Sequence, residues 1–341
     1  MCPIEFTKIQ EILIRKNWIV SAFDVDEKDL YNPANYVCNE KVEGTDYKLI
    51  LDRNLFSFII SAARKPRPKQ IYRDAIALIV FSQIANIMID PNMSVYEKIN
   101  LDRNNADEAV DELNIFYGID NTNSDTLMDY AIGVSNAISP LPMKDFVSND
   151  IKNQLIKHKW LAEWKSLYLI ALNLICISEG KDNSKEKLKQ FISWMVEDFR
   201  LSLVSIVYAI FLFSSIRKKK MIKFKREDSI SIRQQQLNNM TWDLFFANNF
   251  FRKWVDKNAS EEFLVATDDK LVQEILGKAI IIQKEGKIDT LEKYLHPNEK
   301  PILEVISNTI NNTTNRMFNS DKWSLEYRDE LIKKKESLLL N

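Results

Sequence analysis

Two short apolar segments, residues 47–51 and 262–266, read as β-strands, and they constrain this chain most strongly. Each segment runs directly into polar side chains that carry oxygen atoms. In α/β folds, parallel strands bring their carboxyl ends to one edge of a sheet, where ligand and metal sites are built. We therefore expect a parallel sheet with polar side chains at one edge, namely Asp52 and Asn54 after the first strand and Thr267, Asp268 and Asp269 after the second.

The rest of the sequence predicts helices around this sheet. Only 6 glycines and 9 prolines occur in 341 residues, which disfavours a turn-rich β architecture. A hydrophobic fraction of 45% is enough for a substantial core. The expected fold is α/β and helix-rich, with a small parallel sheet flanked by helices and an inserted all-α block.

Hydrophobic periodicity places the expected elements along the chain. Further strands are expected over residues 18–23 and 279–283, and a loop over residues 31–45. A helix starting at Pro91 carries Glu97, and a later helix carries Asp243. The other expected helices cover residues 3–16, 55–64, 70–89, 107–116, 124–138, 149–178, 185–216 with possible interruptions, 301–316 and 324–340.

The residue types leave carboxylates as the available chemistry. Two histidines, His158 and His296, and three widely spaced cysteines provide neither a zinc pattern nor a disulfide framework. The net charge of −1 argues against a wholly basic nucleic-acid-binding protein. The longest apolar run, residues 201–213, is shorter than the roughly 20 residues that a membrane span needs. We expect a soluble, cytoplasmic protein that does not engage a membrane.

The acidic residues also resemble a known family. A strand followed by Asp52-x-Asn54, a helical Glu97, a helical Thr241-x-Asp243 and a strand followed by Thr267-Asp268-Asp269 are similar, in this order, to the carboxylates of PIN-domain nucleases. The interval between Glu97 and Asp243 is much longer than is usual there. The resemblance implies a metal-dependent nuclease domain formed by residues 46–106 and 218–285. Residues 1–45, the helical insertion 107–217 and the C-terminal helices 286–341 would lie outside it.

Hard cations such as Mg²⁺ and Mn²⁺ prefer oxygen ligands, and carboxylates around one cleft repel each other unless a cation binds between them. The expected catalytic and metal-binding residues are Asp52 and Asp243 as central ligands, Glu97 and Asp269 as further ligands, and Asp268 as the alternative to Asp269. Asn54, Thr241 and Thr267 are expected to support them by hydrogen bonding. Each residue also has a plain structural interpretation: a helix cap for Asp268 or Asp269, a turn residue for Asp52, and a surface charge for Glu97.

A basic segment, residues 217–226, precedes the helix that carries Asp243. Its cations are either the favourable C-terminal charges of the preceding helix, followed by a strand over residues 221–225, or a patch that contacts nucleic-acid phosphates. Both interpretations stay open at this point. The expected phosphate contacts are Lys218, Lys219, Lys220, Lys223 and Lys225.

Taken together, the sequence favours a divalent-metal-dependent endoribonuclease-like hydrolase with RNA as the favoured substrate, in a toxin or phage-defence role. The alternative is a non-catalytic helical interaction protein that binds a partner protein through its helical block. A third possibility concerns Asp24-Val25-Asp26, which resembles the nucleophile loop of haloacid-dehalogenase-like phosphatases. Lys28 stands where that loop has Thr or Val, so a solvated turn is the expected structure there.

Overall fold

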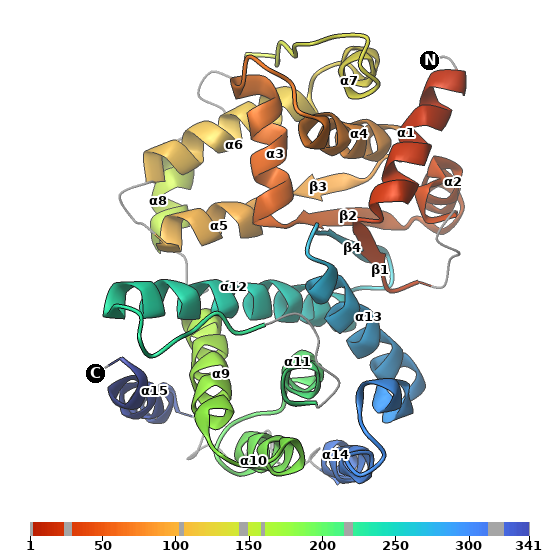
Figure 1. The fold of residues 1–341 in the computed structure, drawn as a ribbon. Coiled ribbons are helices and arrows are strands. Elements are labelled where there is room, and N and C mark those ends of the chain that lie inside the picture. Colours follow the sequence, from red (N-terminus) through yellow and green to blue (C-terminus); the bar gives the residue numbers. More distant parts are fainter. Residues whose placement is uncertain are drawn as a thin grey trace. The chain divides into compact units, whose positions relative to one another are not determined.

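The computed structural model describes residues 3–23, 29–101, 106–142, 149–157, 161–214, 221–312 and 324–340. The chain forms two compact units (Figure 1). The first consists of Met1–His158 with Arg252–Gln273, and the second of Lys159–Phe251 with Glu274–Asn341. The first unit holds a small, mostly parallel sheet flanked by helices, so the predicted helix-rich α/β fold class is confirmed.

The sheet has four strands in the order β1-β4-β2-β3. β2 is parallel to both of its neighbours, whereas β1 is antiparallel to β4. Leu51 is in register with Ala266 and Ile50 with Asp90, so the carboxyl ends of three strands meet at one edge. The strands are β1 (Ile19–Ser21), β2 (Asp46–Leu51), β3 (Met88–Asp90) and β4 (Glu261–Ala266).

Helices of the first unit bury their apolar faces around this sheet. The central helix α4 is buried from Ala75 to Ser82, which confirms the prediction of a core helix at this position. Aromatic side chains fill the space between the helices; Phe56 of α3 and Phe116 of α6, for example, have ring centroids 5.5 Å apart. The helices are α1 (Pro3–Lys16), α2 (Pro33–Glu43), α3 (Arg53–Arg64), α4 (Gln70–Ile84), α5 (Asn92–Leu101), α6 (Ala106–Asp120), α7 (Ser124–Ala131) and α8 (Asn149–Lys157).

The edge strand β3 corrects the prediction of one helix over residues 70–89. α4 ends at Ile84, and Asn86 adopts a left-handed conformation with φ 54°. The Ile87 backbone N–H then donates to the Ser82 carbonyl, and the chain enters β3 beside β2. Periodicity cannot separate a buried helix from a buried strand when nearly every residue is apolar, which is why the strand was missed.

Helix α2 corrects the prediction of a loop over residues 31–45. Asn32 caps the helix by accepting a hydrogen bond from the Ala34 N–H, and Pro33 occupies the first helical turn. Gly44 ends it at φ 68°, a conformation that glycine adopts without steric cost. The Asn, Pro and Gly residues that suggested a loop are therefore the boundary signals of a short helix.

The regular secondary structure among the described residues of the second unit is all helical. The helical segment expected over residues 185–216, with possible interruptions, is interrupted once: α10 ends at Glu197, and Ser202 caps a new helix through its hydroxyl, which accepts from the Ser205 N–H. The predicted strand over residues 279–283 is wrong, since these residues continue a helix. No described helix is long and apolar enough to cross a membrane. The remaining helices are α9 (Leu161–Glu179), α10 (Ser184–Glu197), α11 (Leu203–Phe213), α12 (Ile230–Val255), α13 (Lys270–Glu285), α14 (Pro301–Asn312) and α15 (Leu325–Leu339).

Candidate acidic site at the carboxyl edge of the sheet

A buried hydroxyl joins the ends of β2 and β4. Thr267, which follows β4, is fully buried, and its Oγ1 donates to Asp52 Oδ2 at 2.7 Å. The same oxygen accepts from the Asp269 backbone N–H at 3.1 Å. The strand ends are also joined directly, because the Asp52 N–H donates to the Ala266 carbonyl at 2.9 Å. Asp52 and the loop that carries Asp269 are therefore held in one rigid arrangement.

The environment of Asp52 disfavours its charged form. Burial is the main cause that raises the pKa of this half-buried carboxyl, and the negative charge of Asp269 raises it further. The hydrogen bond from Thr267 and the backbone N–H groups of Arg53 and Asn54 only partly offset these effects. A cation placed against Asp52 and Asp269 would relieve both the desolvation and the repulsion.

Asp268 and Asp269 are adjacent but have different environments. Asp268 Oδ1 accepts from the indole Nε1 of the fully buried Trp18 at 2.7 Å. Asp269 Oδ1 caps α13 by accepting from the Leu271 and Val272 N–H groups at 2.8 and 3.3 Å. The charge of Asp269 contributes to the raised pKa of Asp52. Of the two carboxylates, Asp269 is thus the better candidate for a site shared with Asp52.

Trp18 was not predicted to belong to this edge. It precedes β1, and its carbonyl accepts from the Thr267 N–H at 3.0 Å while its indole holds Asp268. The Lys16 amine lies 5.3 Å from the centroid of its ring. A buried tryptophan needs a hydrogen-bond acceptor for its indole N–H. Asp268 can be identified as that acceptor only once the pairing of β1 with β4 is known, because this pairing brings the two residues together.

We expect Trp18 and Asp268 to be energetically coupled. Combining Trp18→Phe with Asp268→Ala should show a coupling free energy of about 1–3 kcal/mol, because a hydrogen bond to a charged acceptor contributes about that much. Urea unfolding of the wild type, both single variants and the double variant measures it. Strictly additive losses would show that this hydrogen bond does not stabilise the fold.

Helix α5 brings Glu97 to the same side of the first unit. The buried Ser94 hydroxyl donates to the Leu51 carbonyl at 2.9 Å, which fixes α5 against the end of β2. Glu97 lies one turn further along α5 and is half-buried.

Asp90, at the end of β3, is a further edge residue, and the sequence does not predict it because it does not predict β3. Its Oδ2 is 3.1 Å from the Lys253 amine, and its Oδ1 accepts from the Asn92 N–H.

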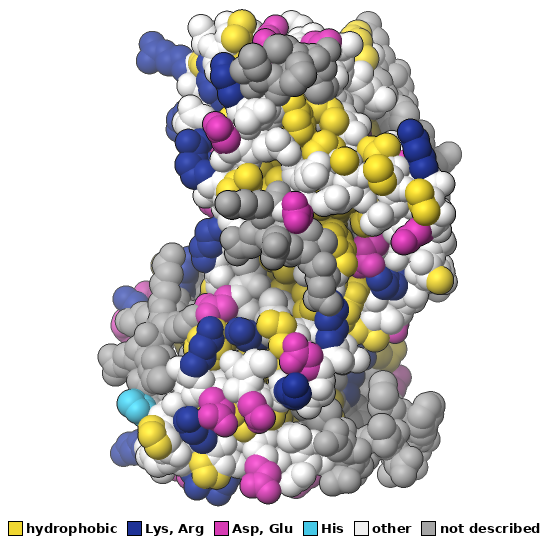
Figure 2. All heavy atoms as spheres, turned by 90° about the vertical axis from the view of Figure 1, so that its right-hand side faces the viewer, with side chains coloured by type: hydrophobic (Ala, Val, Ile, Leu, Met, Phe, Trp, Pro, Cys, Tyr) yellow, Lys and Arg dark blue, Asp and Glu magenta, His cyan; other side chains and the backbone are white. Residues whose placement is uncertain are grey.

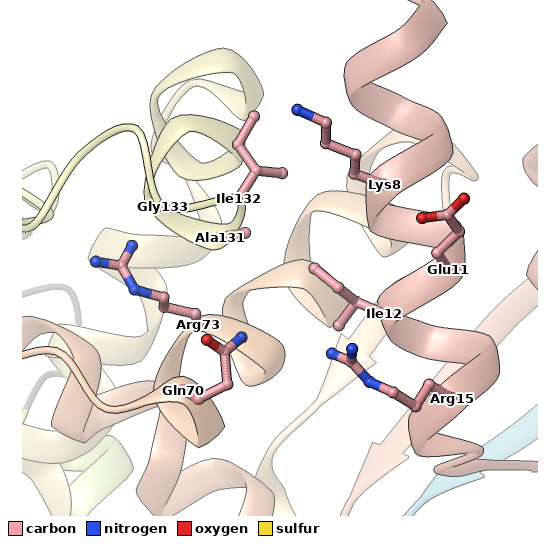
Figure 3. Close-up of a pocket in the computed structure, with 9 residues that line it drawn as sticks. All are labelled: Lys8, Glu11, Ile12, Arg15, Gln70, Arg73, Ala131, Ile132 and Gly133. Atoms are coloured by element: carbon pink, nitrogen blue, oxygen red, sulfur yellow. The ribbon is translucent and has the colours of Figure 1, made fainter.

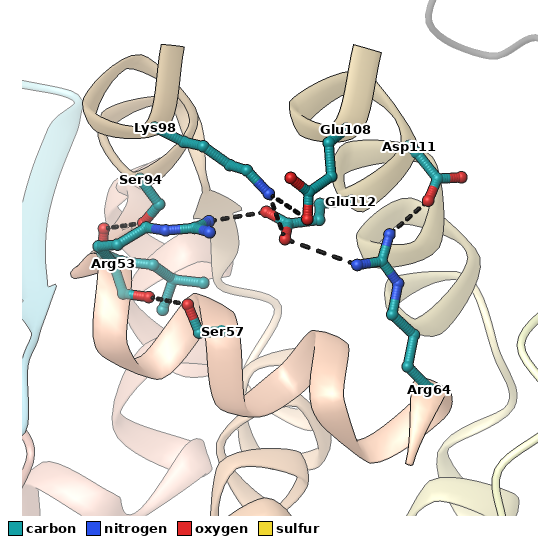
Figure 4. A network of polar contacts seen from close by, with 9 residues as sticks. Arg53, Ser57, Arg64, Ser94, Lys98, Glu108, Asp111 and Glu112 are labelled. Atoms are coloured by element: carbon teal, nitrogen blue, oxygen red, sulfur yellow. Dashed lines mark hydrogen bonds and ion pairs between the residues drawn. The ribbon is translucent and has the colours of Figure 1, made fainter. Parts of the chain in front are cut away.

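Charged side chains beside this edge hold α3, α5 and α6 together (Figure 4). Glu112 accepts from Arg53 Nη1 at 2.9 Å and from Lys98 Nζ at 2.7 Å, and Arg64 Nη1 lies 3.6 Å away. Burial alone would raise the pKa of Glu112, but the hydrogen bonds and charges of Arg53 and Lys98 outweigh it and keep that pKa below its usual range. Arg53 follows Asp52 directly, so this network fixes the first turn of α3.

The other sequence-predicted residues occupy different positions. Asn54 is exposed in the first turn of α3. Asp243 is exposed on α12 and belongs to the second unit, as does the buried Thr241, whose hydroxyl donates to the Leu237 carbonyl of its own helix at 2.8 Å. Within the described residues, no three His, Cys, Asp or Glu side chains form a ready-made metal-binding group. The structure brings together Asp52, Thr267 and Asp269.

The basic segment is described only in part. Lys218, Lys219 and Lys220 lie outside the described residues, as do Asp24 and Asp26. Residues 221–225 do not form the strand that one interpretation predicted. Lys223 and Lys225 are exposed there, whereas Arg226 is paired through two hydrogen bonds, of 2.9 and 2.7 Å, with Glu179.

Charges of both signs are interspersed over the described part of the face in Figure 2, in agreement with the net charge of −1. The molecule therefore has no strong overall field, and any attraction of an ion or a polyanion has to come from local charges such as those at the edge of the sheet.

No family model matches the sequence, and no curated protein or solved structure matches the chain.

Proposed function

We propose that this protein is a divalent-metal-dependent nuclease that hydrolyses phosphodiester bonds, with RNA as the favoured substrate. The observation that carries the proposal is the pair of aspartates at the carboxyl edge of the sheet. The buried Thr267 hydroxyl joins the Asp52 carboxylate to the backbone N–H of Asp269, and burial, together with the charge of Asp269, raises the pKa of Asp52. Perturbed carboxyls of this kind cluster at functional sites.

The donor atoms of this edge fit a hard cation. Asp52, Asp269 and Thr267 offer only oxygen, which suits Mg²⁺ or Mn²⁺. The repulsion of Asp52 by Asp269 is the electrostatic condition that a bound cation relieves. Asp52 and Asp269 would hold the ion, and the order of acidic residues predicts Glu97, on α5 of the same unit, as an additional ligand. When bound, such an ion polarises the phosphoryl group and lowers the pKa of a coordinated water.

The protein's own groups prepare the site for this role. The Thr267 hydroxyl occupies one oxygen of Asp52 and so fixes the orientation of the carboxylate. Capping of α13 by one oxygen of Asp269 fixes that carboxylate in the same way. Ser94 and the network around Glu112 secure α5 and α3, which carry Glu97 and the turn after Asp52. Such preorganisation is what a catalytic metal site requires.

Incubation of labelled single-stranded RNA and DNA with the purified protein tests the proposal. We expect RNA cleavage with millimolar Mn²⁺ and none in EDTA. Cleavage in EDTA, or the absence of cleavage of both nucleic acids with Mn²⁺, would contradict it. The helical interaction alternative predicts no cleavage under either condition.

Neutralisation of Lys218, Lys219 and Lys220 to Gln is expected to weaken RNA binding and flatten its salt dependence. Each phosphate contact on a single strand contributes about 0.7 to the slope of log affinity against log salt, so losing three should reduce the slope by about 2. Fluorescence anisotropy at several salt concentrations measures it. Replacing the exposed Lys333 and Lys334 of α15 by Gln is the control. An unchanged slope in the triple variant would remove this segment from the binding surface.

A further inference from the structure

We propose a second, separate binding site in the first unit, for a nucleoside monophosphate. A cavity of about 410 Å³ opens between α1, α4 and the end of α7 (Figure 3). This volume lies within the range of small-molecule sites. Its walls combine cationic and apolar side chains with one acidic residue: Lys8, Glu11, Ile12 and Arg15 from α1, Arg73 from α4, and Ile132 after α7.

The cations of α1 are directed into this cavity. Lys8, Ile12 and Arg15 follow one another at helical spacing, so they share one face of α1. Figure 3 shows the Lys8 and Arg15 side chains extending toward α7 and α4, whereas the Glu11 carboxylate lies over α1 itself. Two positive groups on either side of an apolar residue suit a phosphate group that lies next to an apolar surface.

The acidic residue that pairs with Arg15 already has a closer cation. Asp74 of α4 is fully buried, with the Lys16 amine 2.7 Å from Oδ2 and the Gln70 amide donating to Oδ1 at 2.8 Å. Arg15 Nη2 is 3.8 Å from the same Oδ1, and its side chain is 65% exposed. Because Lys16 is the closer cation to Asp74 and Arg15 is largely exposed, the Arg15 guanidinium retains donors for a second anion.

The opposite wall is preformed. The Arg73 guanidinium donates to the carbonyls of Tyr130 and Ser135 and to Asn136 Oδ1, and it lies 4.9 Å from the centroid of the Tyr130 ring. These bonds fix the chain where α7 ends. Gly133 turns the chain at φ 88°, which permits this close wrapping around Arg73. Binding therefore needs little ordering of the protein, which favours affinity.

The mixed lining selects the chemical class of the ligand. Lys8 and Arg15 match a phosphate dianion, and Ile12 and Ile132 provide apolar contact for the face of a heterocyclic base. Neither a phosphate group alone nor a base alone would contact both the cationic and the apolar side chains of the cavity. A nucleoside monophosphate should therefore bind more tightly than either inorganic phosphate or the unphosphorylated nucleoside.

Isothermal titration calorimetry of the full-length protein with AMP, GMP, CMP and UMP tests this site, with adenosine and inorganic phosphate as partial ligands. We expect at least one monophosphate to bind at millimolar concentration or below, and the partial ligands to bind at least tenfold more weakly. Lys8→Glu with Arg15→Glu should weaken binding at least tenfold. The matched control is Lys41→Glu with Arg67→Glu, which reverses two exposed charges elsewhere in the same unit.

The result that would overturn the proposal is the absence of wild-type binding, equal affinity for inorganic phosphate, or equal weakening in the control variant. Circular dichroism verifies that both double variants fold, and single Lys8→Gln and Arg15→Gln variants replace the double variant if it does not. Asp52→Asn should leave this affinity unchanged. Failure here and failure of the nuclease proposal are thus separate results.

Discussion

Asp52→Asn and Asp269→Asn should each lower kcat/KM for Mn²⁺-dependent RNA cleavage by about 10³-fold, or about 4 kcal/mol of transition-state stabilisation. Both substitutions keep the size of the side chain and an oxygen acceptor. In Asp52→Asn the amide oxygen can still accept from Thr267. In Asp269→Asn it can still cap α13, since asparagine is as good an N-cap as aspartate. What each variant loses is the negative charge that a cation would need.

Asp268→Asn is the matched control for this prediction. It removes a charge from the adjacent position but keeps an acceptor for the Trp18 indole. We expect its kcat/KM to stay within a few-fold of the wild type, which is small beside the roughly 10³-fold change above. Equal losses for Asp268→Asn and Asp269→Asn would contradict the assignment of the site to Asp269. Asp243→Asn in the same assay tests the sequence prediction for α12.

The same carboxylates should lower the stability of the metal-free protein. Because burial and Asp269 raise the pKa of Asp52, the ionised carboxylate is disfavoured in the folded state. We expect Asp52→Asn to stabilise the fold in EDTA by about 1 kcal/mol, a change opposite in sign to the usual effect of a substitution. For a unit of this size that corresponds to about 2–4 °C in Tm. Thermal melts in EDTA measure it, with the exposed Asp46→Asn at the other end of β2 as the control.

The pH dependence of this difference has a definite sign. A folded-state pKa above the ordinary value of 3.8 means that the folded protein holds more protons than the unfolded chain between the two values. The destabilisation by Asp52 is therefore complete above the raised pKa and disappears as the pH falls below 3.8. The increase in stability caused by Asp52→Asn should be largest near neutral pH and vanish in acid. An increase in stability that is independent of pH would show that the charge of Asp52 is not its cause.

Local sequence patterns were sufficient to predict the two strands that form the centre of the site. β2 and β4 are apolar segments that run into Asp52 and Thr267, and parallel pairing then brings these residues together. The contribution of Trp18 was not predictable in this way, because it depends on the antiparallel pairing of β1 with β4. Long-range pairing of this kind leaves no local pattern in a single sequence.

Two errors in the prediction have related physical causes. The sequence predicts a helix where β3 lies because the residues of this strand continue the apolar run of α4, and the position of Asp90 at the edge is therefore not predicted either. The sequence predicts a loop where α2 lies because the capping residues of this helix are also common in turns. In both places the local pattern fits two structures equally well: a buried helix or a buried strand at β3, and helix caps or a loop at α2.

Calorimetric titration of Mn²⁺ into the wild type, Asp52→Asn and Asp268→Asn tests the shared acidic site most directly. We expect saturable binding in the wild type, its loss or at least about tenfold weakening in Asp52→Asn, and its retention in Asp268→Asn. Binding that is identical in the wild type and Asp52→Asn, or absent from the wild type, would contradict the claim that Asp52 belongs to a metal-binding site.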